Sequence, residues 1–220
     1  EYLATKVLFA EMYAGTVRYC VDWDTWMIWD GTRWAADETI GVDRLCRGLV
    51  QERRRRATEC EDDELREVLE SWAHRCENPT AFESMKKLSR SDPLMVTRSR
   101  EYDVDEWSLN CANGIVDLMY GALDDHTPDK MMTSISPIEY DPDATCPKWE
   151  EFVSWTMKGD KDMISFLQRA LGMSLTGSMK EQVWYFMYGR GANGKSTMLK
   201  VIGNIMGQYA HSAPADLFLE

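Results

Sequence analysis

The sequence lacks paired metal ligands. Its six cysteines stand at positions 20, 46, 60, 76, 111 and 146 with no C-x-x-C pair, and its three histidines, at 74, 126 and 211, are equally dispersed. A structural zinc site needs four ligands, usually contributed by closely spaced pairs. We therefore expect no metal framework and interpret the cysteines as buried or surface thiols in a reducing cytosol.

Long apolar runs are also missing. No stretch approaches the roughly 20 apolar residues that a membrane-spanning helix needs, and the N-terminus shows no signal-peptide pattern. We expect a protein without membrane contact, located in the cytoplasm. Residue 1 is Glu rather than Met, so we also expect that the chain began upstream or was cut.

The third shortage is positive charge, since the formal net charge of the 220 residues is −12. A domain that grips duplex DNA over a broad face is usually basic. Any contact with nucleic acid must therefore be local, or be made by residues beyond Glu220. Residues 1–147 alone are expected to bind single-stranded DNA weakly or not at all.

One motif stands out against these absences, the stretch from Gly189 to Thr197, which reads GRGANGKST. It has the spacing of a phosphate-binding loop, G-x-x-x-x-G-K-[ST]. Glycines let successive backbone N–H groups point at phosphate oxygens, the lysine reaches the β- and γ-phosphates, and the following hydroxyl ligates Mg²⁺. The predicted nucleotide-binding residues are Gly189, Gly191, Asn193, Gly194, Lys195, Ser196 and Thr197, with Lys195 in the catalytic role and Ser196 as the metal ligand.

The flanks of the motif favour this interpretation. Residues 183–188, an apolar and aromatic run, have strand character. After the loop, apolar residues recur at helical spacing as far as Met206, and Gly207 is placed to end that helix. The alternative is a Gly-rich turn between two core elements. The pattern of strand, loop and helix instead predicts a site for ATP and Mg²⁺.

The rest of the chain predicts an α+β module. Residues 1–16 and most of 38–91 have helical periodicity, 17–22 and 26–34 read as a small antiparallel meander, and 91–147 as short strands and turns. Two further helices are expected at 149–157 and 162–175. We place the boundary between modules near residue 148, so that 1–147 form an α+β domain and 148–220 begin an α/β P-loop domain.

Three groups of side chains have two possible interpretations each. The tryptophans at 26, 29 and 34 could stack on bases, but packing in a small core is commoner. The arginines at 53–56 could contact phosphates, but with the acids that follow they are typical of a solvated, ion-paired helix face. The acid pairs 22/24, 103/105 and 124/125 could hold a catalytic metal, but turn and capping chemistry accounts for them better.

Several stretches together resemble a known family. The run from Leu109 to Leu118, with asparagines at 110 and 113, Gly114 and Asp117, looks like the signature that precedes the motor of phage and plasmid primase–helicases, to which the poxvirus primase–helicase is related. The meander ending in Trp34, the turn at 141–147, the segment 166–177 and the Asn-Gly-Lys-Ser form of the loop follow in the expected order. The spacing of the signature suggests turn architecture rather than catalysis.

The resemblance implies an ATP-dependent DNA helicase of superfamily 3, with an AAA+-like motor domain. Such proteins act in the replication of phage, plasmid or viral DNA in the host cytoplasm, bind single-stranded DNA and assemble as homo-oligomers, usually hexameric rings. The family's primase activity lies in a separate upstream domain, and nothing in this sequence matches one.

One departure from the family pattern concerns the acidic strand that positions Mg²⁺ and water in such a motor. No apolar strand ending in paired acids follows Thr197 in this sequence. We therefore expect that the chain stops inside the motor domain and does not hydrolyse ATP by itself. Two alternatives stay open, a P-loop kinase and a non-catalytic oligomerisation or loader-binding module with an idle loop.

Overall fold

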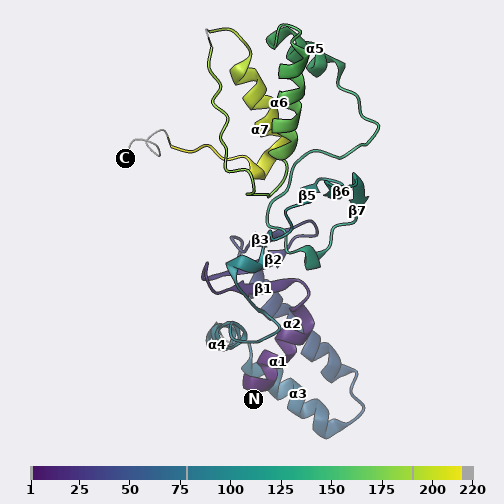
Figure 1. Ribbon diagram of the computed structural model, residues 1–220. Coiled ribbons are helices and arrows are strands. Elements are labelled where there is room, and N and C mark those ends of the chain that lie inside the picture. Colours follow the sequence, from purple (N-terminus) through teal and green to yellow (C-terminus); the bar gives the residue numbers. More distant parts are fainter. Residues whose placement is uncertain (1, 78, 190, 215–220) are drawn as a thin grey trace. The chain divides into compact units, whose positions relative to one another are not determined.

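The computed structural model describes residues 2–77, 79–189 and 191–214, with side chains from Leu8 onward. The chain divides into two compact units, residues 1–102 and 103–220. Both are mixtures of helices and small sheets, so the expected α+β module is confirmed. Figure 1 shows the helices and strands of each unit.

The first unit combines four helices with a four-stranded sheet. Its helices are α1 (Tyr2–Tyr13), α2 (Gly41–Thr58), α3 (Asp63–Arg75) and α4 (Pro79–Ser89). Its strands are β1 (Val17–Cys20), β2 (Thr25–Trp29), β3 (Trp34–Ala36) and β4 (Val96–Thr97), in the order β3-β2-β1-β4. β1, β2 and β3 pair antiparallel as the meander predicted, and β4 joins β1 in parallel.

Local chemistry explains the turns of this unit. The Asp30 carboxylate accepts hydrogen bonds from the backbone N–H of Thr32 (2.8 Å) and of Arg33 (2.9 Å), which closes the turn between β2 and β3. The Asp37 carboxylate accepts from the N–H of Gly41 and of Val42, at 2.7 and 2.9 Å. It therefore satisfies two of the donors that the first turn of α2 leaves unpaired.

The core of the first unit contains most of the tryptophans that could have served as base-stacking platforms. Trp34 is 1% exposed and Trp26 is 8% exposed, whereas Trp29 is half-buried and pairs with Trp34 across β2 and β3. Trp26 packs with Phe9 of α1 and Tyr19 of β1. The expectation that these rings belong to a core is therefore confirmed for Trp26 and Trp34.

The second unit begins with a three-stranded antiparallel meander, β5 (Ser108–Cys111), β6 (Gly114–Asp117) and β7 (Ala122–Asp124). Helices α5 (Pro147–Thr156), α6 (Lys161–Met173) and α7 (Lys195–Met206) follow, close to the predicted ranges. A 3₁₀ turn, η3 (Gly207–Tyr209), continues directly from α7, and another, η2 (Pro128–Lys130), lies between β7 and α5. Leu175 and Tyr209 pack against a small core of β5 and β6 residues, which joins the C-terminal part to the meander.

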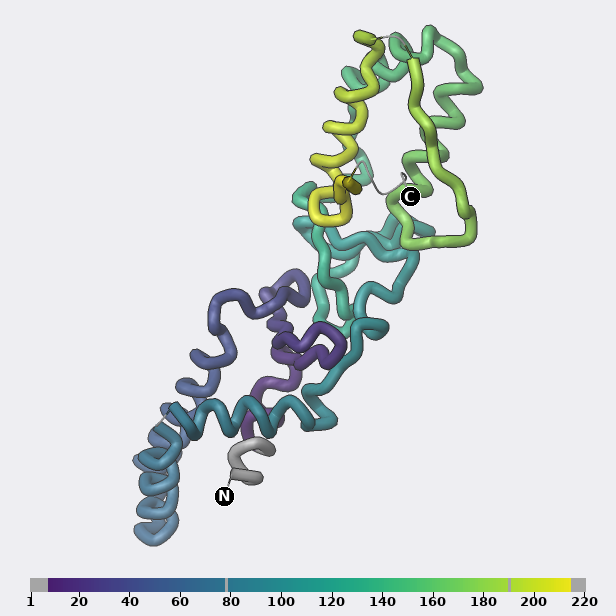
Figure 2. The backbone as a smooth tube through the Cα atoms, turned by 90° about the vertical axis from the view of Figure 1, so that its left-hand side faces the viewer, coloured from purple at the N-terminus to yellow at the C-terminus, as the bar shows by residue number. Residues whose placement is uncertain are grey.

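Residues 183–188 are not a strand, so the expectation of a P-loop strand is wrong for this structure. The stretch forms a long coil in Figure 1 and an extended run in Figure 2. Both of its faces are open to solvent, since Phe186 is 89% exposed on one face and Val183 is 57% exposed on the other. A strand of a parallel sheet needs neighbours that pair with its backbone and cover both faces, and no described strand pairs with this one.

The boundary between domains expected at 147 and 148 stays a prediction. The division into compact units falls after Tyr102, and contacts of Leu175 and Tyr209 with the meander lie within the second unit. That 148–220 begin an ATPase domain stays a prediction. Within the described residues, no helix has the length and apolarity needed to cross a bilayer.

Candidate nucleotide-binding site

The predicted phosphate-binding loop lies between the coil 183–188 and the N-terminus of α7. Two of its glycines have positive φ angles, +149° at Gly189 and +81° at Gly194, which caps α7. A Cβ on Gly189 would overlap with the Asn193 amide, and one on Gly194 would lie 2.9 Å from Cζ of Phe152. Both backbone conformation and space therefore require glycine at these two positions.

The Lys195 side chain folds back over this loop. Its Nζ donates to the side-chain Oδ1 of Asn193 at 2.7 Å and to the backbone oxygen of Gly189 at 3.2 Å. The ammonium group of the half-buried Lys195 thus lies against the loop residues Gly189 and Asn193. Phosphate oxygens approaching the loop would meet this positive charge and the N-terminal end of the α7 dipole together.

The remaining predicted residues face solvent. Gly191 is exposed, and Ser196 and Thr197 are exposed in the first turn of α7. α7 is anchored one residue later, where Met198 is 1% exposed and its N–H donates to the Gly194 oxygen at 2.9 Å. The structure therefore gathers Gly189, Asn193, Gly194 and Lys195, and leaves the Ser196 hydroxyl accessible to a metal ion from solution.

The arginines at 53–56 are occupied by contacts within the first unit. Arg53 lies over the Trp72 ring, with its guanidinium carbon 4.6 Å from the ring centre. Arg54 pairs with Glu77, Arg55 pairs with Glu52 and Glu59, and Arg56 pairs with Glu52. The interpretation of an ion-paired helix face is therefore confirmed.

The acid pairs serve turns and segment contacts. Asp22 accepts from the N–H and hydroxyl of Ser99, and Asp103 accepts from the N–H and hydroxyl of Thr133. Asp105 accepts from the N–H of Trp107 at 3.1 Å. Nowhere in the described part of the chain do three or more His, Cys, Asp or Glu residues gather as a metal-binding group.

The signature residues between β5 and β7 shape the meander, as their spacing suggested. The side-chain amide of Asn113 donates to the backbone oxygen of Tyr140 at 2.9 Å and accepts from the backbone N–H of Tyr140 at 2.8 Å. Gly114 has a φ of +150° and no room for a Cβ beside the Asp124 oxygen. Asp117 accepts from the N–H of Met119 and of Tyr120 in the next turn.

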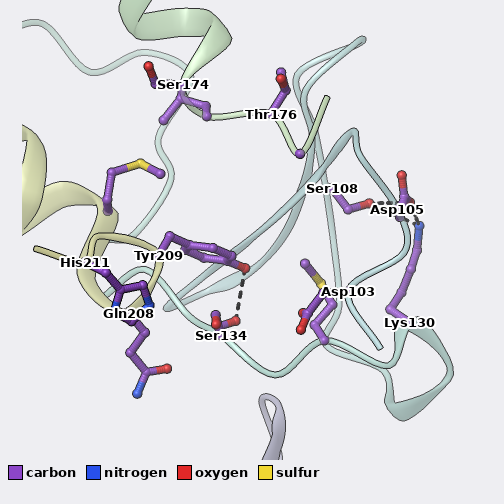
Figure 3. Close-up of a pocket in the computed structure, with 14 residues that line it drawn as sticks. Asp103, Asp105, Ser108, Lys130, Ser134, Ser174, Thr176, Gln208, Tyr209 and His211 are labelled. Atoms are coloured by element: carbon purple, nitrogen blue, oxygen red, sulfur yellow. Dashed lines mark hydrogen bonds and ion pairs between the residues drawn. The ribbon is translucent and has the colours of Figure 1, made fainter. Parts of the chain in front are cut away.

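A cavity of about 330 Å³ in the second unit is a feature that sequence reasoning missed (Figure 3). Residues far apart in sequence line it, among them Asp105, Lys130, Thr176, Tyr209 and His211. The ammonium of Lys130 lies 2.8 Å from the Asp105 carboxylate, and this charge, followed by the Ser108 hydroxyl, lowers the pKa of Asp105 to about 2. No local pattern could have revealed it, because its walls meet only in the folded chain.

These features define a class of protein, an α+β module of small sheets that leads into a glycine-rich loop and an exposed helix N-terminus. Comparison with known proteins is consistent with that class. Residues 6–158, more than half of the chain, match the family described as "D5 N terminal like". The chain therefore belongs to the D5 N-terminal-like family, and the resemblance to phage and viral primase–helicases is confirmed.

A curated viral relative supports the same assignment. The chain is 29% identical over 111 residues to a protein of Acanthamoeba polyphaga mimivirus named "Putative helicase L207/L206". The match covers 49% of this chain and 12% of that protein, so the chain spans only a small part of its relative. These findings identify a protein related to the helicases and primases of DNA replication.

Proposed function

We propose that residues 189–197 bind the phosphates of ATP and that the chain is part of an ATP-dependent DNA helicase of superfamily 3. The observation that carries this proposal is the Lys195 ammonium held over the loop by Asn193 and Gly189, at the N-terminus of α7. Family membership favours this proposal over a P-loop kinase. In the full-length protein, ATP and Mg²⁺ would drive movement along single-stranded DNA.

The residues at the loop fit Mg²⁺-ATP by their chemistry. Positive φ angles at Gly189 and Gly194 curve the backbone without side chains in the way. Lys195 supplies the cation, and Ser196 offers an exposed hydroxyl for Mg²⁺. When bound, the metal would neutralise charge on the β- and γ-phosphates.

The test is isothermal calorimetry with Mg²⁺-ATP on the 220-residue chain. Lys195→Ala is expected to weaken binding at least tenfold, because charge-assisted contacts of an ammonium with phosphate are each worth about 1.5–3 kcal/mol. Lys200→Ala is the matched control, since Lys200 is exposed on the same helix, outside the loop. Equal affinities of the two variants would show that the loop does not hold the phosphates.

We propose that this chain alone does not hydrolyse ATP. No acidic side chain forms a hydrogen bond or ion pair with residues 189 and 191–197 of the described structure. Phosphoryl transfer needs an acid to complete the Mg²⁺ site and a group to orient water. We propose that other parts of the protein supply them, along with most contacts to single-stranded DNA and to the other copies of a cytoplasmic homo-oligomeric, hexameric ring.

A non-catalytic module with an idle loop remains the alternative, because Lys195 is already satisfied by oxygens of its own loop. The calorimetric test separates the two. An idle loop predicts no heat of binding for the parent chain, and no change of solution mass on adding ATP.

A further inference from the structure

The two ends of α7 have different surroundings. Its N-terminus carries the phosphate-binding loop, and its C-terminus passes directly into η3. With 12 residues, the helix is about 18 Å long. Half of its twelve residues are exposed, among them Leu199 at 58%, and Met198 near the N-terminus is its most buried residue at 1%. Contacts at its two ends therefore contribute to the placement of α7.

Tyr209 makes the principal contact at the C-terminal end. Its hydroxyl donates to the backbone oxygen of Ser134 at 3.0 Å and accepts from the backbone N–H of Asn110 at 3.2 Å (Figure 3). The ring packs against the core formed by Leu109, Cys111 and Val116. Burial raises the pKa of Tyr209 to about 12, so the hydroxyl keeps its proton at neutral pH and remains a donor.

A second set of contacts fixes the same turn. The Gln208 side-chain oxygen accepts from the Ile135 N–H at 3.1 Å, and the Gln208 N–H donates to the Ile135 oxygen at 3.3 Å. The Ser136 hydroxyl donates to the Ile205 oxygen at 2.6 Å, and Ser136 is 2% exposed. These bonds join residues separated by about 70 positions in sequence, and we call this set, with Tyr209, the η3 contact.

The N-terminal end rests on α5. Gly194 lies so close to Phe152 that a Cβ would meet its ring at 2.9 Å, and a Cβ would also lie 3.0 Å from the Thr156 hydroxyl. A shift of α7 along or about its axis would therefore disturb the loop at one end and the η3 contact at the other. A rigid element with defined contacts at both ends can couple two sites.

We propose that Tyr209 is a positioning residue for nucleotide binding, acting through α7 to hold the phosphate-binding loop in its binding geometry. This inference rests on the proposed function of that loop. If the η3 contact already orders α7 in the unbound chain, then nucleotide binding does not spend free energy on ordering this helix. Thermodynamic linkage then requires the reverse effect, so that nucleotide at the loop strengthens the η3 contact.

Strand β5 then has a role in nucleotide binding beyond the turn architecture that its signature predicted. Asn110 is fully buried, its backbone N–H donates to Tyr209, and its side-chain amide donates to the Ser134 oxygen at 3.1 Å. Asn110 and Tyr209 thus share one acceptor. Nucleotide binding at the loop would therefore change the stability of hydrogen bonds in the meander β5–β7, which contains the family signature.

The experiment compares the parent chain with Tyr209→Phe, which removes the hydroxyl but keeps the ring in its core. Tyr120→Phe is the matched control, since Tyr120 is 82% exposed in the same unit. Calorimetry with Mg²⁺-ATP should give an affinity about fivefold lower for Tyr209→Phe, the factor that corresponds to ~1 kcal/mol. The control should bind like the parent.

Hydrogen exchange provides a readout that a merely structural role would not change. In the parent chain, Mg²⁺-ATP should slow amide exchange at Asn110 and Ile135, and in Tyr209→Phe this response should be largely lost. A structural defect alone would speed exchange equally with and without nucleotide.

The outcomes separate the two proposals. Binding of ATP by the parent chain without any change of exchange at Asn110 and Ile135 would overturn this inference and leave the proposed function standing. Equal affinities of the parent and Tyr209→Phe would do the same. Absence of ATP binding by the parent chain would overturn the proposed function and this inference together.

Discussion

Gly207 allows a sharp test of how α7 ends. Its φ angle is +54°, and a Cβ there would overlap with Cδ of Pro137 and lie 3.1 Å from the Ile135 oxygen. Gly207→Ala therefore introduces two costs. The left-handed backbone costs an L-residue about 1–2 kcal/mol, and forcing extra volume against a rigid ring costs about 1–3 kcal/mol.

A partial offset comes from the unfolded chain, because alanine has fewer unfolded conformations than glycine, by about 0.4–1 kcal/mol. The net expectation is that Gly207→Ala destabilises the second unit by about 2–4 kcal/mol. The matched control is Gly203→Ala on the same helix. A Cβ at Gly203 meets nothing within 4 Å, so this variant should be stabilised by about 0.5–1 kcal/mol.

The assay is urea unfolding of both variants, with amide exchange to locate the change. In Gly207→Ala, the Gln208 N–H, which donates to the Ile135 oxygen, should lose protection. The Met198 N–H, near the other end of α7, should lose less. If the two variants unfold at the same urea concentration, then the steric argument for the end of α7 is wrong.

Two further predictions concern charged side chains. Lys130→Met should raise the pKa of Asp105 from about 2 toward its ordinary value of 3.8, as read from an NMR titration of the carboxyl carbon. Because the folded pKa is lowered, the stability that Asp105 contributes is present above about pH 4 and lost as the pH falls toward 2; an unchanged titration would refute the pairing. Arg53→Ala should destabilise the first unit by about 1 kcal/mol, because the guanidinium covers the Trp72 ring. Arg55→Ala, which breaks exposed ion pairs, should lower the free energy of unfolding by less than half as much. Urea unfolding of both variants measures this difference, and equal losses of stability would contradict the stacking of Arg53 on Trp72.

The occupied arginines also bear on DNA binding. Arg54, Arg55 and Arg56 each pair with a glutamate in the first unit. A phosphate would have to displace these partners, in a chain whose net charge is already −12. Weak binding of single-stranded DNA by residues 1–147 therefore stays our expectation.

Elements that depend on local pattern were predictable from the sequence. The helices α2, α3 and α6 follow from apolar periodicity, and the meander from strand residues around the Asp30 turn. The interpretation of 189–197 as a phosphate-binding loop rests on glycines and a lysine within one short stretch, and it stays a prediction. In each case the residues that determine the conformation are neighbours in the chain.

The run 183–188 shows where local pattern is insufficient. Its residues favour a strand, but a strand exists only where other strands pair with its backbone, and none of the described strands does so. The preference of the side chains for a pleated, half-buried surface is real, yet it carries no information about whether that surface is present.

Only the tertiary structure decided the contacts at the C-terminal end of α7 and the lining of the cavity. The bond between Tyr209 and Asn110 joins residues 99 positions apart, and the pairing of Asp105 with Lys130 spans 25. The residues around Tyr209 and Asn110 do not predict this contact, because it depends on the packing of the segment after α7 against the meander. The sequence by itself determined most of the elements, and its phosphate-binding loop stays a prediction; the folded chain determined the contacts at both ends of α7, since contacts over such separations depend on the arrangement of whole elements.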